Sequence, residues 1–151
     1  MRKVSALLVM IVFGLPAIAE ELKPITGGDR YNHNVNDSFF CTTQALVTIG
    51  LWEMRDFDDS EPGKVTEWAK LPFGFKISST DRIEFTDSFP FKLLGHNDPY
   101  PAGINRMGNL VFAQSDIVVG RAEGIPSELR LRAIQYDGFR TSVLHAICQK
   151  I

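Results

Sequence analysis

The chain has 151 residues, 44% of them hydrophobic and 23% charged, and a formal net charge of −2. This length suits one domain, and the composition is that of a folded globular protein rather than a disordered one. The mildly acidic charge argues against a nucleic-acid partner, because binding to phosphates needs clustered Lys and Arg side chains.

The N-terminal segment, residues 1–19, has the three parts of a secretory signal peptide. Arg2 and Lys3 are followed by an apolar stretch, and then by Ala17 and Ala19 at the two positions that signal peptidase inspects. A transmembrane helix needs about 20 apolar residues, and this stretch is shorter and is broken by a proline. We therefore predict a periplasmic or secreted protein with no membrane span in its mature form. Removal of the two bases leaves 14 basic against 18 acidic residues, a charge of −4.

The segment after the signal, residues 20–38, is polar and contains glycine, which predicts an extended lead-in. Residues 39–52 alternate apolar and polar side chains with a period of two and are rich in Thr and Val, which predicts the first strand of a single β domain over residues 39–151. A helix capped by Asp37 is the alternative. Residues 65–70 are expected to form a short helix or an edge strand.

Short alternating segments in the middle of the chain predict further strands, separated by polar turns. Their apolar positions are Phe73, Phe75 and Ile77; Ile83 and Phe85; Phe89, Phe91 and Leu93; Leu110 and Phe112; and Ile117 and Val119. Residues 95–108 are rich in Asn, Pro and Gly, which predicts a long loop.

A hairpin is predicted near the C-terminus, because Asp137-Gly138 is a preferred sequence for a two-residue turn. Such a turn pairs Tyr136 with Phe139 and Leu131 with Leu144. One face of the hairpin is then mostly apolar, as a buried face requires. That face carries Leu129, Leu131, Ala133, Leu144, Ala146 and Cys148. Together the elements predict an all-β fold, a small antiparallel barrel or sandwich of about eight strands.

The two cysteines, Cys41 and Cys148, lie near the two ends of the mature domain. In an oxidising compartment this pair predicts one disulfide. It would join the first and last strands, which barrel closure brings together. A reactive or metal-binding thiol is the alternative, but the spacing matches no zinc pattern.

The sequence contains no catalytic or metal-binding motif, and we expect no metal or other cofactor. The long loop is the best candidate for recognition, since it presents His96, Asp98 and Tyr100. Trp52 and Trp68 flank predicted turns and are candidate aromatic contacts. Aromatic side chains at such places can instead fill the ends of a barrel core.

The general plan, a signal peptide before a short β domain with a cysteine near each end, is similar to that of small periplasmic proteins of Gram-negative bacteria. Among these are the membrane-bound inhibitors of c-type lysozyme, eight-stranded barrels that block a host enzyme. Their Ser-Gly-x-x-Tyr segment is not found in this chain, so no inhibitory residue can be carried over.

Three functions are open at this point. The first is a non-catalytic domain that binds a protein or an envelope component through loops and aromatic side chains. The second is a carrier of a small apolar ligand inside a barrel, which needs an internal cavity of about 300 Å³ or more. The third is an unrecognised hydrolase, which needs acidic or His groups that converge in one cleft.

Overall fold

The computed structural model describes residues 21–28, 30–50, 65–91, 99–114, 117–138 and 140–151. These residues form nine strands and no helix. The strands are β1 (Ser38–Gly50), β2 (Val65–Glu67), β3 (Phe73–Ser79), β4 (Arg82–Phe85), β5 (Tyr100–Ile104), β6 (Leu110–Gln114), β7 (Val118–Ile125), β8 (Glu128–Tyr136) and β9 (Arg140–Lys150). In this part of the chain no helix has the length and apolar character needed to cross a membrane. The predicted signal peptide, with Ala17 and Ala19, lies outside the described residues.

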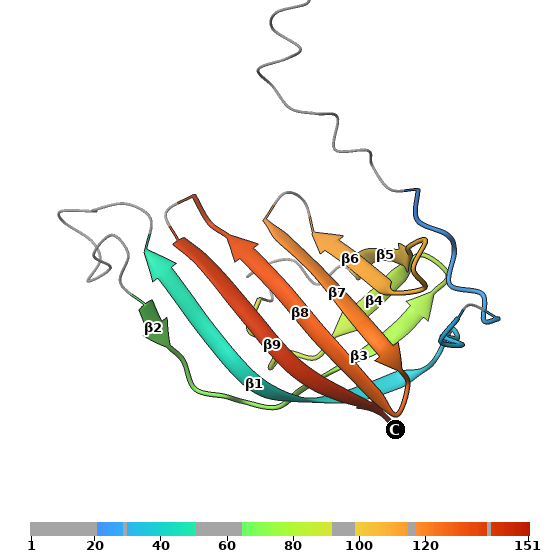
Figure 1. Ribbon diagram of the computed structural model, residues 1–151, viewed down its shortest axis with the longest axis horizontal. Coiled ribbons are helices and arrows are strands. Elements are labelled where there is room, and N and C mark those ends of the chain that lie inside the picture. Colours follow the sequence, from blue (N-terminus) through green and yellow to red (C-terminus); the bar gives the residue numbers. More distant parts are fainter. Residues whose placement is uncertain (1–20, 29, 51–64, 92–98, 115–116, 139) are drawn as a thin grey trace, which may run out of the picture.

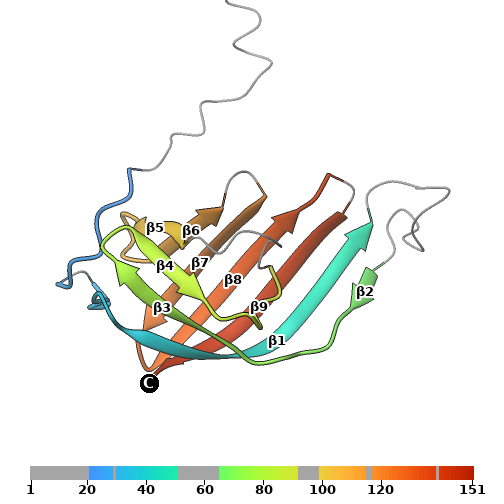
Figure 2. The same ribbon diagram turned by 180° about the vertical axis from the view of Figure 1, so that it is seen from behind.

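Eight of the strands form a closed antiparallel barrel. Strands β3 to β9 follow one another in chain order, and β1 closes the ring by pairing with β3 on one side and with β9 on the other. Figures 1 and 2 show β7, β8, β9 and β1 side by side as a long wall, with the shorter β3 to β6 across from it. The short strand β2 extends the sheet beside the far half of β1. The predicted all-β fold is confirmed, and it is a barrel rather than a sandwich.

The predicted disulfide joins the first and last strands. Cys41 in β1 and Cys148 in β9 lie directly opposite each other in the antiparallel register, with their Cα atoms 3.9 Å apart. Both side chains are fully buried. The covalent bond therefore lies inside the seam at which the barrel closes, where the two ends of the folded domain meet.

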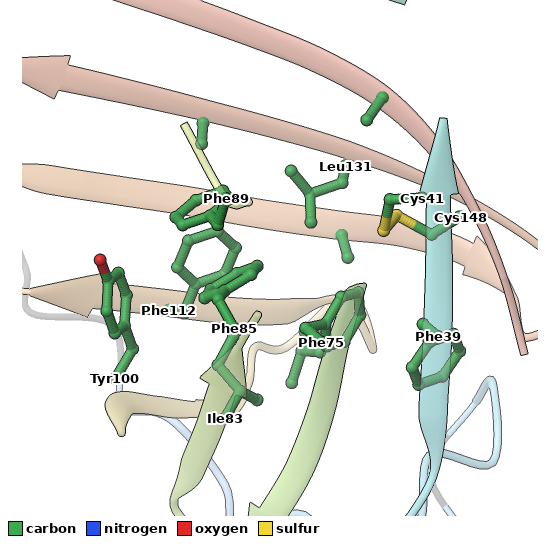
Figure 3. Close-up of a cluster of buried hydrophobic side chains, with 14 of the residues drawn as sticks. Phe39, Cys41, Phe75, Ile83, Phe85, Phe89, Tyr100, Phe112, Leu131 and Cys148 are labelled. Carbon is green, nitrogen blue, oxygen red and sulfur yellow. A yellow bond between two sulfur atoms is a disulfide. The ribbon is translucent and has the colours of Figure 1, made fainter. Parts of the chain in front are cut away.

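The inside of the barrel is filled by aromatic rings. The rings of Phe85 and Phe89 stack with their centroids 3.8 Å apart, and Phe112 and Tyr100 pack against Phe85. Figure 3 shows these rings gathered together, with the disulfide beside them. Gly120 in β7 leaves room for one of these rings, because an added Cβ there would collide with the Phe112 ring. Gly120 and Phe112 are directly opposite each other on the neighbouring strands β7 and β6, so the glycine and the ring complement each other in a packed core.

One end of the barrel is closed by the lead-in. Lys23 pairs with Ile104 at the end of β5, and the backbone N–H of Ile25 donates to the carbonyl of Thr80. The side chain of Ile25 is fully buried as a result. Asp37, at the end of the lead-in, forms an ion pair of 2.6 Å with Lys150. The other end, where β1 and β8 end, has no such cover from the described residues, and we call it the mouth.

A β-bulge in β1 decides which side chains face the mouth. The register between β1 and β9 shifts between Thr43 and Ala45, so Gln44 is an extra residue. The continuous alternation predicted for residues 39–52 is therefore broken: the odd positions face inward before the bulge and the even positions after it. A bulge of this kind re-aims the side chains that follow. It turns Thr48 into the barrel, where it is buried.

The last hairpin forms as predicted, but with a longer turn. Leu131 pairs with Ala146 rather than Leu144, and the turn runs from Asp137 to Arg140. The Asp137 carboxylate accepts a hydrogen bond of 2.7 Å from the backbone N–H of Arg140, which holds this wider turn. The register differs from the prediction by two residues, an even number, so the predicted apolar face is still the buried one.

Two further expectations are wrong. The predicted strand at Phe89–Leu93 begins in a turn, where the Phe89 N–H donates to the carbonyl of Thr86, and the Phe89 and Phe91 rings enter the core from there. The predicted loop 95–108 contains strand β5. Proline has no backbone N–H to donate to a neighbouring strand. Strand β5 tolerates Pro101 because its side chain is exposed and the backbone N–H of the next residue, Ala102, makes the hydrogen bond to the carbonyl of Asp81.

Candidate binding pocket at the barrel mouth

A pocket of about 420 Å³ opens at the mouth. Its lining combines apolar and aromatic residues with polar ones. The apolar and aromatic residues are Leu46, Trp68, Ala69, Leu71, Pro90 and Phe91, and the polar residues are Thr48, Ser88, Gln135, Asp137, Arg140 and Ser142. Four separate parts of the chain contribute, so only the folded barrel assembles this pocket.

Three polar side chains form a row across the inner face of the long wall. Thr48 in β1 is directly opposite Ser142 in β9, and Ser142 is directly opposite Gln135 in β8. Neighbouring strands lie about 4.8 Å apart, so the three side chains are evenly spaced across the wall. We call Thr48, Ser142 and Gln135 the polar row.

Trp68 lies beside this row in a fixed position. Its backbone N–H donates to the carbonyl of Leu46, 2.9 Å away, which continues the pairing of β2 with β1. Its indole Nε1 donates to the Thr48 hydroxyl at 2.7 Å. The side chain of Trp68 is nevertheless 48% exposed. The hydrogen bond from Nε1 thus fixes the position of the indole, while much of the ring remains accessible to solvent.

The polar row retains unused hydrogen-bonding capacity. The Thr48 and Ser142 hydroxyls are 2.7 Å apart, and either can be the donor. Together with the Trp68 indole they supply three N–H or O–H donors but make two hydrogen bonds among themselves. One hydroxyl hydrogen therefore remains for another acceptor. The side-chain amide of Gln135 is likewise unbonded to any described residue, and it adds donors and an acceptor to the same wall.

The electrostatics of the pocket are balanced. Asp137 and Arg140 are the acidic and the basic residue of the described lining, and they are tied together through the Asp137 carboxylate and the Arg140 N–H. The described lining contains no His, Cys or Lys, and the described residues hold no cluster of three metal-ligating side chains. What the pocket offers is a fixed aromatic surface and a set of hydrogen-bonding groups.

The candidates from the sequence have different places in the structure. Trp68 lines the pocket. Tyr100 is buried in β5 rather than exposed for recognition, and its hydroxyl donates to the carbonyl of Phe91 at 2.9 Å. His96 and Asp98, in the predicted recognition loop, and Trp52 lie outside the described residues.

Sequence reasoning missed the polar row. Uninterrupted alternation puts Thr48 on the face opposite Cys41, and nothing in the sequence marks the bulge at Gln44 that turns it inward. A usable indication was present in the last hairpin, where the inward positions are apolar along most of its length and end in Gln135 and Ser142. Polar residues at the end of an apolar face indicate that this end of the strand is in contact with water or with a ligand.

Two hollows larger than this pocket lie outside the barrel. A groove of about 530 Å³ runs over β1, β3 and β4 beside Phe40, and another of about 490 Å³ lies beside the lead-in with Lys23, Arg30 and Arg106. The groove is largely apolar and the second hollow is cationic, and neither combines a fixed aromatic ring with a row of polar side chains like that at the mouth.

No protein-family model, curated protein or solved structure matches this chain. Its function therefore has to be argued from the mouth itself.

Proposed function

We propose that this protein is an exported, non-catalytic binding domain that takes its ligand at the mouth of the barrel. The observation that carries the proposal is the indole of Trp68, exposed and yet held by Thr48 next to a polar row with hydrogen-bonding capacity that no described residue uses. Preorganised aromatic anchors of this kind are typical of binding sites, because little side-chain freedom is lost when a partner arrives.

The packed core favours binding at the mouth over transport of an apolar ligand inside the barrel. A carrier needs a cavity among its core side chains, whereas here the rings of Phe85, Phe89 and Phe112 occupy that space. These three rings do not line the pocket, whereas Phe91 does. A carrier whose ligand enters the core would have to displace these rings.

One observation from the sequence and one from the structure support export. The N-terminal sequence has the pattern of a cleavable signal, and the folded domain contains a buried disulfide, which forms and persists in oxidising compartments. We place the mature protein in the periplasm or outside the cell, where its partner is a protein or an envelope component.

The test separates binding at the mouth from binding elsewhere. The mature, oxidised protein is incubated with lipid, glycan and protein fractions of a bacterial envelope, and retained material is measured for the wild type, Trp68→Ala and Phe40→Ala. Phe40 is the matched control, because it is 49% exposed and lies on the outer groove. We expect one fraction to be retained by the wild type and Phe40→Ala and lost with Trp68→Ala. Equal retention by all three proteins, or chemical conversion of the retained material, would contradict the proposal.

A further inference from the structure

We propose that the ligand at the mouth is a neutral saccharide, with one pyranose ring lying on the indole of Trp68. This inference rests on the proposed function and names the chemical class of its ligand. It follows from three properties of the pocket: what the indole offers, what the polar row offers, and the charge of the lining.

The indole offers a face and no further donor. Its Nε1–H is already committed to the Thr48 hydroxyl, so the exposed part of the ring presents only its π surface, which is partly negative. A pyranose ring carries C–H bonds on its two faces, and these bear a partial positive charge. Such a ring packs on an indole with both apolar contact and favourable electrostatics.

The polar row matches the edge of the same ring. A sugar carries hydroxyl groups around its rim, each of which donates and accepts. The remaining hydroxyl hydrogen of the Thr48–Ser142 pair and the free amide of Gln135 supply both kinds of partner. An apolar ligand would instead cover these groups without replacing their bonds to water, and each such loss costs about 1–3 kcal/mol. The row therefore selects against a purely apolar occupant.

The charge of the lining favours a neutral ligand. Asp137 and Arg140 contribute one negative and one positive charge to the described lining, so its charged side chains sum to zero. A strongly anionic or cationic ligand would meet no excess of opposite charge among the described lining residues. The volume of about 420 Å³ falls in the range of small-molecule sites, which suits one or two sugar rings rather than a long chain.

The experiment titrates three ligand classes against the mature, oxidised protein. They are a panel of neutral oligosaccharides of glucose, galactose, mannose and N-acetylglucosamine, palmitate as an apolar ligand, and a tripeptide library. Binding to each protein is measured by isothermal titration calorimetry, and in the wild type the shift of the Trp68 indole N–H resonance in NMR spectra, assigned with Trp68→Phe, locates the ligand at the mouth. That variant also keeps an aromatic ring if Trp68→Ala should fail to fold, which its melting curve reports.

We expect an oligosaccharide of the panel to shift this resonance. Trp68→Ala should weaken the binding roughly 30-fold, as for an aromatic anchor, and Trp68→Phe should weaken it less. Ser142→Ala should weaken it roughly fivefold, for one hydrogen bond. Phe40→Ala and Ser127→Ala, on other surfaces of the barrel, should bind like the wild type.

The possible outcomes distinguish a failure of the saccharide inference from a failure of the proposed function. Trp68-dependent binding of palmitate or of peptides, with no saccharide bound, overturns the ligand class and leaves the mouth as the binding site. Saccharide binding that neither Trp68→Ala nor Ser142→Ala weakens overturns both the site and the proposed function. Binding of none of the three classes overturns the saccharide inference, and the retention experiment with envelope fractions then decides the proposed function.

Discussion

Removal of the disulfide should lower the stability of the barrel by a predictable amount. Cys41 and Cys148 are 107 positions apart, and in the chain-entropy model a cross-link over such a loop stabilises the folded state by about 4–5 kcal/mol. For a domain of this size each kcal/mol corresponds to roughly 3–4 °C in melting temperature. The unlinked protein should therefore melt about 15 °C lower.

The assay is urea unfolding of the mature protein with the bond intact and after reduction in the unfolded state, together with the double variant Cys41→Ala/Cys148→Ala. The variant removes two buried sulfur atoms as well as the bond, so it should be less stable than the reduced wild type. Because the bond acts mainly on the unfolded chain in this model, refolding should slow more than unfolding accelerates.

A loss below about 1 kcal/mol in the reduced protein would refute the reasoning, since the model ties the effect to the length of the closed loop. It would mean that the pairing of β1 with β9 already restrains the unfolded chain. A loss confined to the double variant would attribute the effect to packing around the sulfur atoms rather than to the covalent link.

Three substitutions test other parts of the fold. Gly120→Ala should cost about 1–3 kcal/mol in urea unfolding, because the new Cβ meets the Phe112 ring at 2.1 Å; adding Phe112→Leu should recover part of the loss, and no recovery would place the strain elsewhere. Tyr100→Phe should cost about 1–2 kcal/mol, because the carbonyl of Phe91 loses its buried partner; an unchanged unfolding midpoint would show that the bond contributes nothing. Deletion of Gln44 removes the bulge and should reverse the inner and outer sides of residues 45–50. Measured in a Trp52→Phe background, a shifted Trp68 emission spectrum would report this change, and unchanged emission would show that the bulge re-forms elsewhere.

Much of the barrel could be predicted because its information is local. Alternating apolar positions in the last hairpin identify the buried face whatever the register, since an error of two residues leaves each side chain on its own face. The disulfide could be predicted from the number of cysteines together with the predicted export signal. Strand β5 was hidden by its proline and glycine, whose tolerance depends on which neighbouring backbone groups need a partner.

The candidate site could be predicted only in part. Trp68 stands out in the sequence as an aromatic residue near a turn, yet the sequence does not say whether it fills the core or faces solvent. Its three polar neighbours come from positions far apart in the chain, and Thr48 and Ser142 are separated by 94 residues. Only the pairing of β1 with β9 brings their hydroxyls together.

The amino-acid sequence alone determined the all-β class, the export signal as a prediction, and the pairing of two cysteines, because periodicity, composition and cysteine number act over short stretches or over the whole chain. Tertiary structure decided closure into a barrel, the filled interior and the polar mouth. The physical reason is the extra residue at Gln44 in β1. This residue reverses which side chains after it point into the barrel and which point outward. Whether the chain accommodates it as a bulge depends on the strand with which β1 pairs.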